Sequence, residues 1–139
     1  MSFSSVTPGL LYHDAPTAIE WLCRAFGLEK RVVVAGCDGT IIHAHLTLGG
    51  GGIMLSSAES YTATELCKSP RHVGGVGTVE LIVFVPDPDA HHSRAASEGA
   101  QIIAAPEDKP YGGRGYVCRD IEGHVWAFSS YDPWATAVA

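Results

Sequence analysis

The two halves of the chain carry the same structural signals at one fixed spacing. Asp14 and Asp87 each stand just before a proline and the start of a helical pattern, and they lie 87 − 14 = 73 residues apart. Ser56-Ser57 and Ser129-Ser130 close a strand-like segment in each half and lie 129 − 56 = 73 residues apart. A single offset that needs no gap indicates a duplicated unit. Because one such unit leaves an apolar sheet face uncovered, we expect the two units to fold together.

Turn residues and hydrophobic periodicity predict a strand, a helix and then three strands in each unit. The segments of the first unit are a strand at 9–12, a helix at 14–26 and strands at 31–35, 40–48 and 53–57. Those of the second unit are a strand at 78–85, a helix that begins at Asp87 or Asp89 and ends at 98, and strands at 101–105, 115–119 and 124–130. Asp14 is a good helix N-cap, and the four glycines at 49–52 predict a hairpin turn.

These elements predict a single α+β domain over residues 1–139, with repeats at 6–58 and 77–131 joined by a connection at 59–76. Tandem βαβββ modules would form a curved, mostly antiparallel eight-stranded sheet. Its concave face would enclose a cavity, which is where we expect a ligand to bind.

The composition argues against several classes of partner. Hydrophobic residues make up 46% and charged residues 17% of the chain, as in an ordinary globular domain. The formal net charge is −6 and the nine Lys and Arg residues are scattered, so we expect no binding to nucleic acid or to an anionic membrane. We also expect no membrane span, no N-terminal leader and no disulfide framework among the four cysteines. The chain is therefore expected to be cytoplasmic.

Several stretches of the chain resemble one protein superfamily. They are Leu10-Leu11-Tyr12, HAHLTLG at 43–49, YGGRGY at 111–116 and RDIEGHVW at 119–126. On these motifs the chain resembles the vicinal-oxygen-chelate superfamily, which includes glyoxalases, bleomycin-resistance proteins and dioxygenases, and most of all its PhnB-like branch. The resemblance covers nearly the whole chain and implies the tandem βαβββ fold. It also implies a homodimer with ligand cavities at or near the interface, because relatives commonly pair their halves between chains.

The resemblance further implies where a metal would bind. Enzymes of the superfamily usually hold a divalent metal with four side chains, one on the first and one on the last strand of each half. The corresponding positions of this chain are Thr7, Met54, Glu80 and Ala127. Only Glu80 is a plausible ligand, whereas a catalytic metal normally needs about three protein ligands. We therefore expect no metal cofactor at the standard positions.

His43 and His45 raise a different possibility. At i and i+2 on one strand they point to the same side, which we expect to face the cavity. With Glu80 they would resemble a site of two histidines and one carboxylate for a divalent metal. Alternatively, the two imidazoles would form hydrogen bonds with a ligand, with water or with neighbouring residues.

Three further residues are candidates for ligand binding. Trp126 could stack on a planar ligand, or it could belong to the core. Tyr111 and Arg114 belong to the glycine-containing loop that lies near the cavity mouth in relatives. Arg114 could meet an anionic group of the ligand or face solvent.

Other polar residues are expected to have structural or surface roles only. Asp120 and Glu122 are interpreted as acids of a surface turn, and His91 and His92 as solvent-facing residues of the second helix.

Two functions follow from these observations. The first is a metal-free small-molecule-binding protein, like the antibiotic-sequestering relatives, whose ligand is partly aromatic or amphipathic. The residues expected to bind it are His43, His45, Glu80, Tyr111, Arg114 and Trp126. The second is a lyase, isomerase or dioxygenase acting on a small oxygenated metabolite, with a non-standard metal site or with Glu80 as the catalytic acid or base. A subunit or regulator without a ligand of its own is a third possibility.

Overall fold

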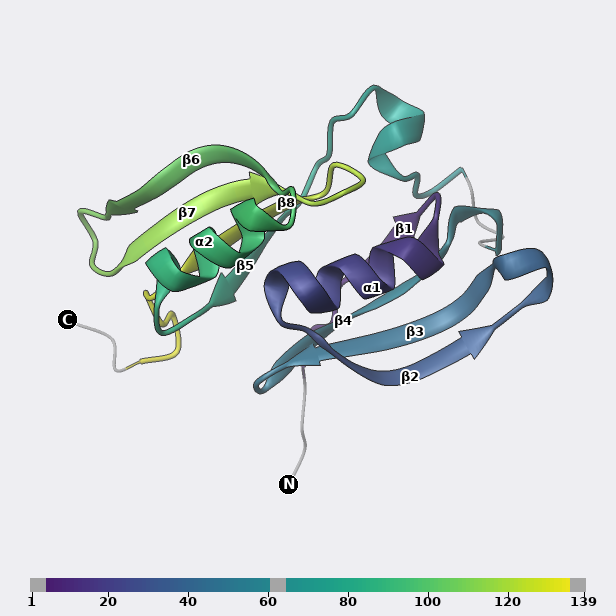
Figure 1. Cartoon of the computed structure of the whole chain (residues 1–139), viewed down its shortest axis with the longest axis horizontal. Coiled ribbons are helices and arrows are strands. Elements are labelled where there is room, and N and C mark those ends of the chain that lie inside the picture. Colours follow the sequence, from purple (N-terminus) through teal and green to yellow (C-terminus); the bar gives the residue numbers. More distant parts are fainter. Residues whose placement is uncertain (1–4, 61–64, 136–139) are drawn as a thin grey trace.

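The computed structural model describes residues 5–60 and 65–135 and confirms the α+β fold with two βαβββ modules (Figure 1). The first module consists of β1 (Gly9–Tyr12), α1 (Ala15–Phe26), β2 (Glu29–Ala35), β3 (Ile41–Leu48) and β4 (Gly51–Ser57). The second consists of β5 (Glu80–Phe84), α2 (Pro88–Ser97), β6 (Gln101–Asp108), β7 (Arg114–Arg119) and β8 (Val125–Ser129). Short 3-10 turns at Ala58–Ser60 and Pro70–Val73 lie in the connection between the modules.

Each module has its own four-stranded mixed sheet. The strand orders are β1-β4-β3-β2 and β5-β8-β7-β6, and the pairs β1–β4 and β5–β8 are parallel. Gly9 pairs with Met54 in the first sheet and Ile82 pairs with Ala127 in the second, which is the same register shifted by the offset read from the sequence. The duplication is therefore a structural one. The eight strands form two separate sheets and not one continuous sheet.

Both helices begin where the sequence predicts. The Asp14 carboxylate accepts a hydrogen bond from the Thr17 N–H, and Gly27 ends α1 with a φ of +82°, a conformation that glycine adopts without strain. At the second helix the cap is Asp87 and not Asp89, because the Asp87 carboxylate accepts a hydrogen bond from the Ala90 N–H.

Several strand boundaries differ from the prediction by one to three residues, among them those of β4 and β6. The hairpin turn uses only the first two glycines of the run, since Gly51 and Gly52 already pair with Leu48 and Thr47. Strand β6 continues through Pro106 to Asp108, where register shifts interrupt its ladder with β7. A proline is tolerated there because β6 is an edge strand.

The helix-covered sides of the two sheets share one core. Figure 1 shows α1 and α2 side by side, each in front of its own sheet. The Phe26 ring of α1 lies 5.1 Å from the Trp126 ring and 4.8 Å from the Phe128 ring, both of β8. The opposite side of each sheet is left open: Val34 is 43%, Phe84 51% and Ile82 70% exposed. We call these the open face of the first sheet and the open face of the second sheet.

The second module also holds both ends of α1. At the N-terminus, the Glu122 carboxylate accepts hydrogen bonds from the N–H groups of His13 (2.5 Å) and Asp14 (2.7 Å). At the C-terminus, Arg94 of α2 donates to the Arg24 carbonyl (2.7 Å) and the His91 ring contacts the Phe26 carbonyl (2.9 Å). These groups satisfy backbone atoms that the helix itself leaves unpaired. The two modules are therefore fixed to each other through α1.

His91 forms part of this junction rather than facing solvent as expected. Its Nε2 faces the Phe26 carbonyl and so carries the proton, which leaves Nδ1 to accept a hydrogen bond from the Tyr116 hydroxyl at 2.6 Å. Burial lowers the pKa of His91, with a smaller contribution from the charge of Arg94, while hydrogen bonding to Phe26 acts in the opposite direction. The folded protein thus favours the neutral imidazole.

We expect His91 to make the stability of the fold depend on pH. As the pH falls through about 6.5, the unfolded chain takes up a proton at this residue before the folded chain does. The stabilisation by neutral His91 is therefore complete above that pH and declines below it. Urea denaturation measures the free energy of unfolding at pH 7.5 and at pH 5.5. Between these two pH values it should fall less for His91→Gln than for the parent. Equal losses in the two proteins would contradict the assignment.

Among the described residues, no helix has the length and apolar character needed to cross a bilayer.

Candidate functional site

His43 and His45 lie on the open face of the first sheet. Their neighbours in β3, Ala44 and Leu46, are fully buried on the side that α1 covers, so strand alternation turns both imidazoles the other way. His45 pairs with Met54 of β4 and with Val32 of β2 on that same face. The open face therefore combines two imidazoles with a thioether and β-branched side chains.

A glycine makes room for the ring of His45. A Cβ atom added to Gly52 would lie 3.2 Å from His45 Nε2 and only 2.5 Å from the Leu46 carbonyl oxygen, which is too close for any larger residue. The imidazole thus lies over Gly52. None of the hydrogen bonds within residues 5–60 and 65–135 involves the ring of His43 or His45. Both rings are partly exposed and are available to a ligand.

Glu80 lies on the open face of the second sheet. Leu81 beside it is buried in the shared core, whereas Glu80, Ile82 and Phe84 alternate to the exposed side of β5. The carboxylate is therefore accessible and has apolar neighbours along the strand. It belongs to a different sheet from His43 and His45, so one chain does not assemble these three residues into one site.

The donor set does not fit a divalent metal at the standard positions. Thr7 precedes β1, while Met54 and Ala127 lie on β4 and β8 and provide a thioether and a methyl group. Of these four residues Glu80 carries the one carboxylate and Thr7 only a neutral hydroxyl, whereas such ions require several strong ligands. Within the described part of the chain, no three His, Cys, Asp or Glu residues lie close enough together to hold a metal ion.

The remaining predicted residues have different environments. Trp126 is 1% exposed and stacks on Phe128. It therefore belongs to the core, which was one of the two roles expected for it. Tyr111 is exposed in the loop and meets Tyr131 edge to face. Arg114 pairs with Asp89 (2.9 Å) and Asp108 (3.3 Å), which already engage its guanidinium.

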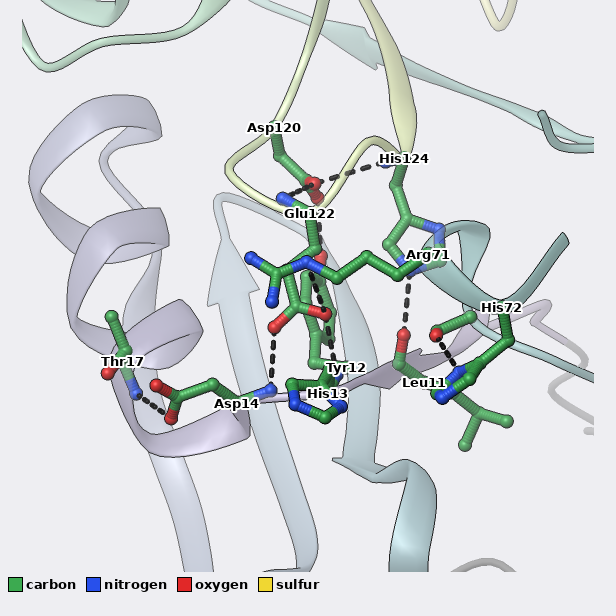
Figure 2. Close-up of polar contacts among 11 residues, drawn as sticks. Leu11, Tyr12, His13, Asp14, Thr17, Arg71, His72, Asp120, Glu122 and His124 are labelled. Atoms are coloured by element: carbon green, nitrogen blue, oxygen red, sulfur yellow. Dashed lines mark hydrogen bonds and ion pairs between the residues drawn. The ribbon is translucent and has the colours of Figure 1, made fainter. Parts of the chain in front are cut away.

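A buried polar cluster lies at the junction of the modules (Figure 2). It contains Asp120 and Glu122, which the sequence had suggested to be acids of a surface turn. The Asp120 carboxylate accepts hydrogen bonds from the Tyr12 hydroxyl (2.6 Å) and the Trp126 indole (3.0 Å), and also from the N–H groups of Glu122 and His124. Asp120 and Glu122 are each 5% exposed, which corrects their interpretation as surface acids. Burial first, and then the charge of Asp120, raise the pKa of Tyr12, so its hydroxyl stays protonated.

Further polar contacts of this cluster also join segments that lie far apart in the sequence. His124 Nε2 lies 2.9 Å from the Leu11 carbonyl oxygen, and Arg71 lies 4.0 Å from the Glu122 carboxylate (Figure 2). Only the three-dimensional structure reveals these pairs, because their members lie far apart in the sequence. The one signal in the sequence was the RDIEGH stretch, which carried the family resemblance.

A cavity of about 320 Å³ borders the cluster, between the start of α1 and the turn before β8. Polar side chains from both modules line it, including Asp14, Thr17, Glu59, Arg71 and Glu122. A second cavity of about 230 Å³ adjoins it and shares His13 and Glu59 in its wall.

Comparison with known proteins agrees with this architecture. The model of the Glyoxalase/Bleomycin resistance protein/Dioxygenase superfamily matches residues 6–128. The uncharacterized proteins Rv0887c of Mycobacterium tuberculosis and Mb0911c of Mycobacterium bovis are 33% identical over 123 residues, which are 88% of this chain and 72% and 80% of those proteins.

Two solved structures show the same fold. TioX from Micromonospora sp. ML1 has a TM-score of 0.72 at 37% identity, with 91% of this chain and 98% of TioX covered. A glyoxalase/bleomycin resistance protein/dioxygenase family enzyme from Burkholderia phytofirmans PsJN has a TM-score of 0.67 at 19% identity, with 87% and 93% covered. Since the family model covers most of the chain, this protein belongs to the Glyoxalase/Bleomycin resistance protein/Dioxygenase superfamily.

Proposed function

We propose that the protein binds a small, partly aromatic or amphipathic molecule without a metal at the standard positions. The observation that carries this proposal is the pair of open faces, one with His43, His45 and Met54 and the other with Glu80 and Phe84. Exposed apolar area interspersed with a few free polar groups is typical of a ligand-binding surface. The scarcity of oxygen and imidazole ligands at the standard positions favours binding over metal-dependent chemistry.

The binding cavity, in this proposal, forms between two copies of the chain. The junction at α1 fixes the modules with their helix-covered sides together, and among the described residues Val34, Ile82 and Phe84 of the two open faces stay exposed. The open face of the first sheet of one protomer would lie opposite the open face of the second sheet of its partner. In a two-fold dimer such a contact occurs twice, giving two equivalent cavities. His43 and His45 would then share a cavity with the partner's Glu80.

Two narrower assignments accompany this proposal. The YGGRGY and RDIEGHVW stretches support a place in the PhnB-like branch. The four cysteines are free thiols, which supports a reducing, cytoplasmic location.

Substituting both imidazoles tests the binding site. We expect His43→Ala/His45→Ala to abolish the stabilisation of the protein by any ligand found in a thermal-shift screen of aromatic and antibiotic-like compounds. The two rings provide the free hydrogen-bonding groups of the first open face, and an unpaired polar ligand group would be costly to bury. His92→Ala, which removes a histidine from α2, is the matched control and should bind like the parent. Unchanged ligand affinity in the double variant would refute the assignment of this face.

An enzyme with an acid or base carboxylate is the second candidate. The exposed position of Glu80 on an open face favours it, because a general base must reach its substrate. If the protein is such an enzyme, Glu80→Gln will bind the substrate but lose turnover. For a pure binding protein, the parent and Glu80→Gln both leave a bound ligand chemically unchanged, which mass spectrometry of the ligand would show.

A further inference from the structure

The open face of the first sheet carries three neutral donors, none of which is a hard oxygen ligand. His43 and His45 of β3 provide imidazole nitrogens, and Met54 of β4 provides a thioether sulfur. Imidazole and thioether groups are ligands of monovalent copper, whereas a thioether contributes nothing to sites for hard divalent ions. Met54, one of the residues that make the standard site unsuitable for such ions, is thus suited to a different metal.

The strand register brings these donors close together. His45 and Met54 are directly opposite each other in the antiparallel pair, which places their Cβ atoms about 5 Å apart. His43 is two residues from His45 on the same side of the strand, at roughly 7 Å, and diagonal to Met54 at about 7–8 Å. All three side chains are long enough to reach a common point above this triangle.

The surroundings leave the donors free to converge. Within the described ranges no hydrogen bond occupies either imidazole, and Val32, Val34 and Met54 on this face are 42%, 43% and 39% exposed. The His45 ring rests over Gly52, and rotation about its Cα–Cβ bond would turn it towards Met54. The partly exposed Val32 and Val34 of β2 border the donors and give the site an apolar rim. An apolar rim favours a singly charged ion over a more strongly hydrated divalent one.

We propose that His43, His45 and Met54 form a binding site for a Cu(I) ion on the open face of the first sheet. The site shares only Met54 with the standard metal positions, and it requires no residue of the second module. His43 and His45 also belong to the face proposed to bind the organic ligand, but the three ligands come from one sheet of one chain, so Cu(I) binding needs neither that ligand nor the partner's Glu80.

The composition of the chain allows a direct test by NMR. The protein has only two methionines, Met1 and Met54, so selective ¹³C labelling of methionine methyl groups gives one resonance for the site and one internal reference. Cys23, Cys37 and Cys67 are accessible thiols that would compete for the ion, and they are replaced by serine in the parent used for titration. Cu(I) is added anaerobically with ascorbate. We expect the Met54 methyl resonance to shift and to saturate near one equivalent, while that of Met1 stays in place.

Variants of the ligands complete the test in competition with a chromophoric Cu(I) chelator. Met54→Leu keeps the volume of the side chain but lacks sulfur, and it should weaken Cu(I) binding by at least about tenfold, as should His43→Ala and His45→Ala. His92→Ala is the matched control and should bind like the parent. Zn(II) should leave the Met54 methyl resonance unmoved. A Met54 resonance unaffected by Cu(I), or parental affinity in Met54→Leu, would overturn the proposal; amide spectra of each variant confirm that it is folded.

Discussion

Replacing Asp120 by alanine should lower the free energy of unfolding by about 3–5 kcal/mol, which is a large share of the stability of a small domain. The Asp120 carboxylate is the common acceptor for the Tyr12 hydroxyl, the Trp126 indole and two backbone N–H groups of the turn before β8. Without it, these buried donors would lose the acceptor that they share. Leaving a buried donor unpaired costs about 1–3 kcal/mol for each group.

Urea denaturation followed by tryptophan fluorescence measures this effect. Glu65→Ala serves as the control, since Glu65 is an exposed acid of the connection, and it should leave the midpoint unchanged. Asp120→Asn keeps one acceptor oxygen and should lie between the parent and Asp120→Ala. A loss below about 1 kcal/mol in Asp120→Ala would show that the cluster does not join the modules.

Phe26→Ala is expected to have an effect of similar size, about 3–5 kcal/mol, because it creates a cavity where the two modules meet. The ring of Phe26 is 1% exposed and contacts Trp126 and Phe128 of the second module as well as Trp21 of its own helix. Since the modules share this core, both should unfold in a single transition at a lower urea concentration.

The comparison for Phe26→Ala is Tyr111→Ala, which truncates an aromatic side chain that is 64% exposed. It should change the unfolding free energy little. Near-UV circular dichroism and tryptophan fluorescence would report on both modules, because Trp21 and Trp126 lie in different ones. Two separate transitions in the parent protein would contradict a shared core.

Local signals in the sequence were sufficient for the order of elements. Asp14 and Gly27 act through contacts within a few residues, so their roles as helix cap and helix stop could be read directly. The sequence did not predict that β1 pairs with β4 and β5 with β8 in parallel, but the offset of the repeat is the one that relates these two pairs. Strand alternation likewise predicted that His43 and His45 share a side.

Long-range contacts were not accessible in the same way. Asp120 and Glu122 look like ordinary turn acids until Tyr12 and the start of α1 are brought against them from the other module. The alternation of residues along β8 is the same whether Trp126 faces a ligand or the core. The Phe26 ring, which packs against Trp126, shows that it faces the core. Similarly, the sequence placed Glu80 and the two histidines in one cavity, whereas the packing of the modules puts them on separate open faces.

We propose above that the two open faces form the functional surface and are covered by a second copy of the chain. Sedimentation equilibrium of the parent and of Phe84→Lys tests it most directly. Phe84 is 51% exposed on the open face of the second sheet, and a lysine there would place an unpaired charge in the proposed interface. Val76→Lys, at an exposed site in the connection, is the control. The account predicts a dimer for the parent and for Val76→Lys and a folded monomer for Phe84→Lys. A monomeric parent at micromolar concentration, or a Phe84→Lys protein that remains dimeric, would contradict it.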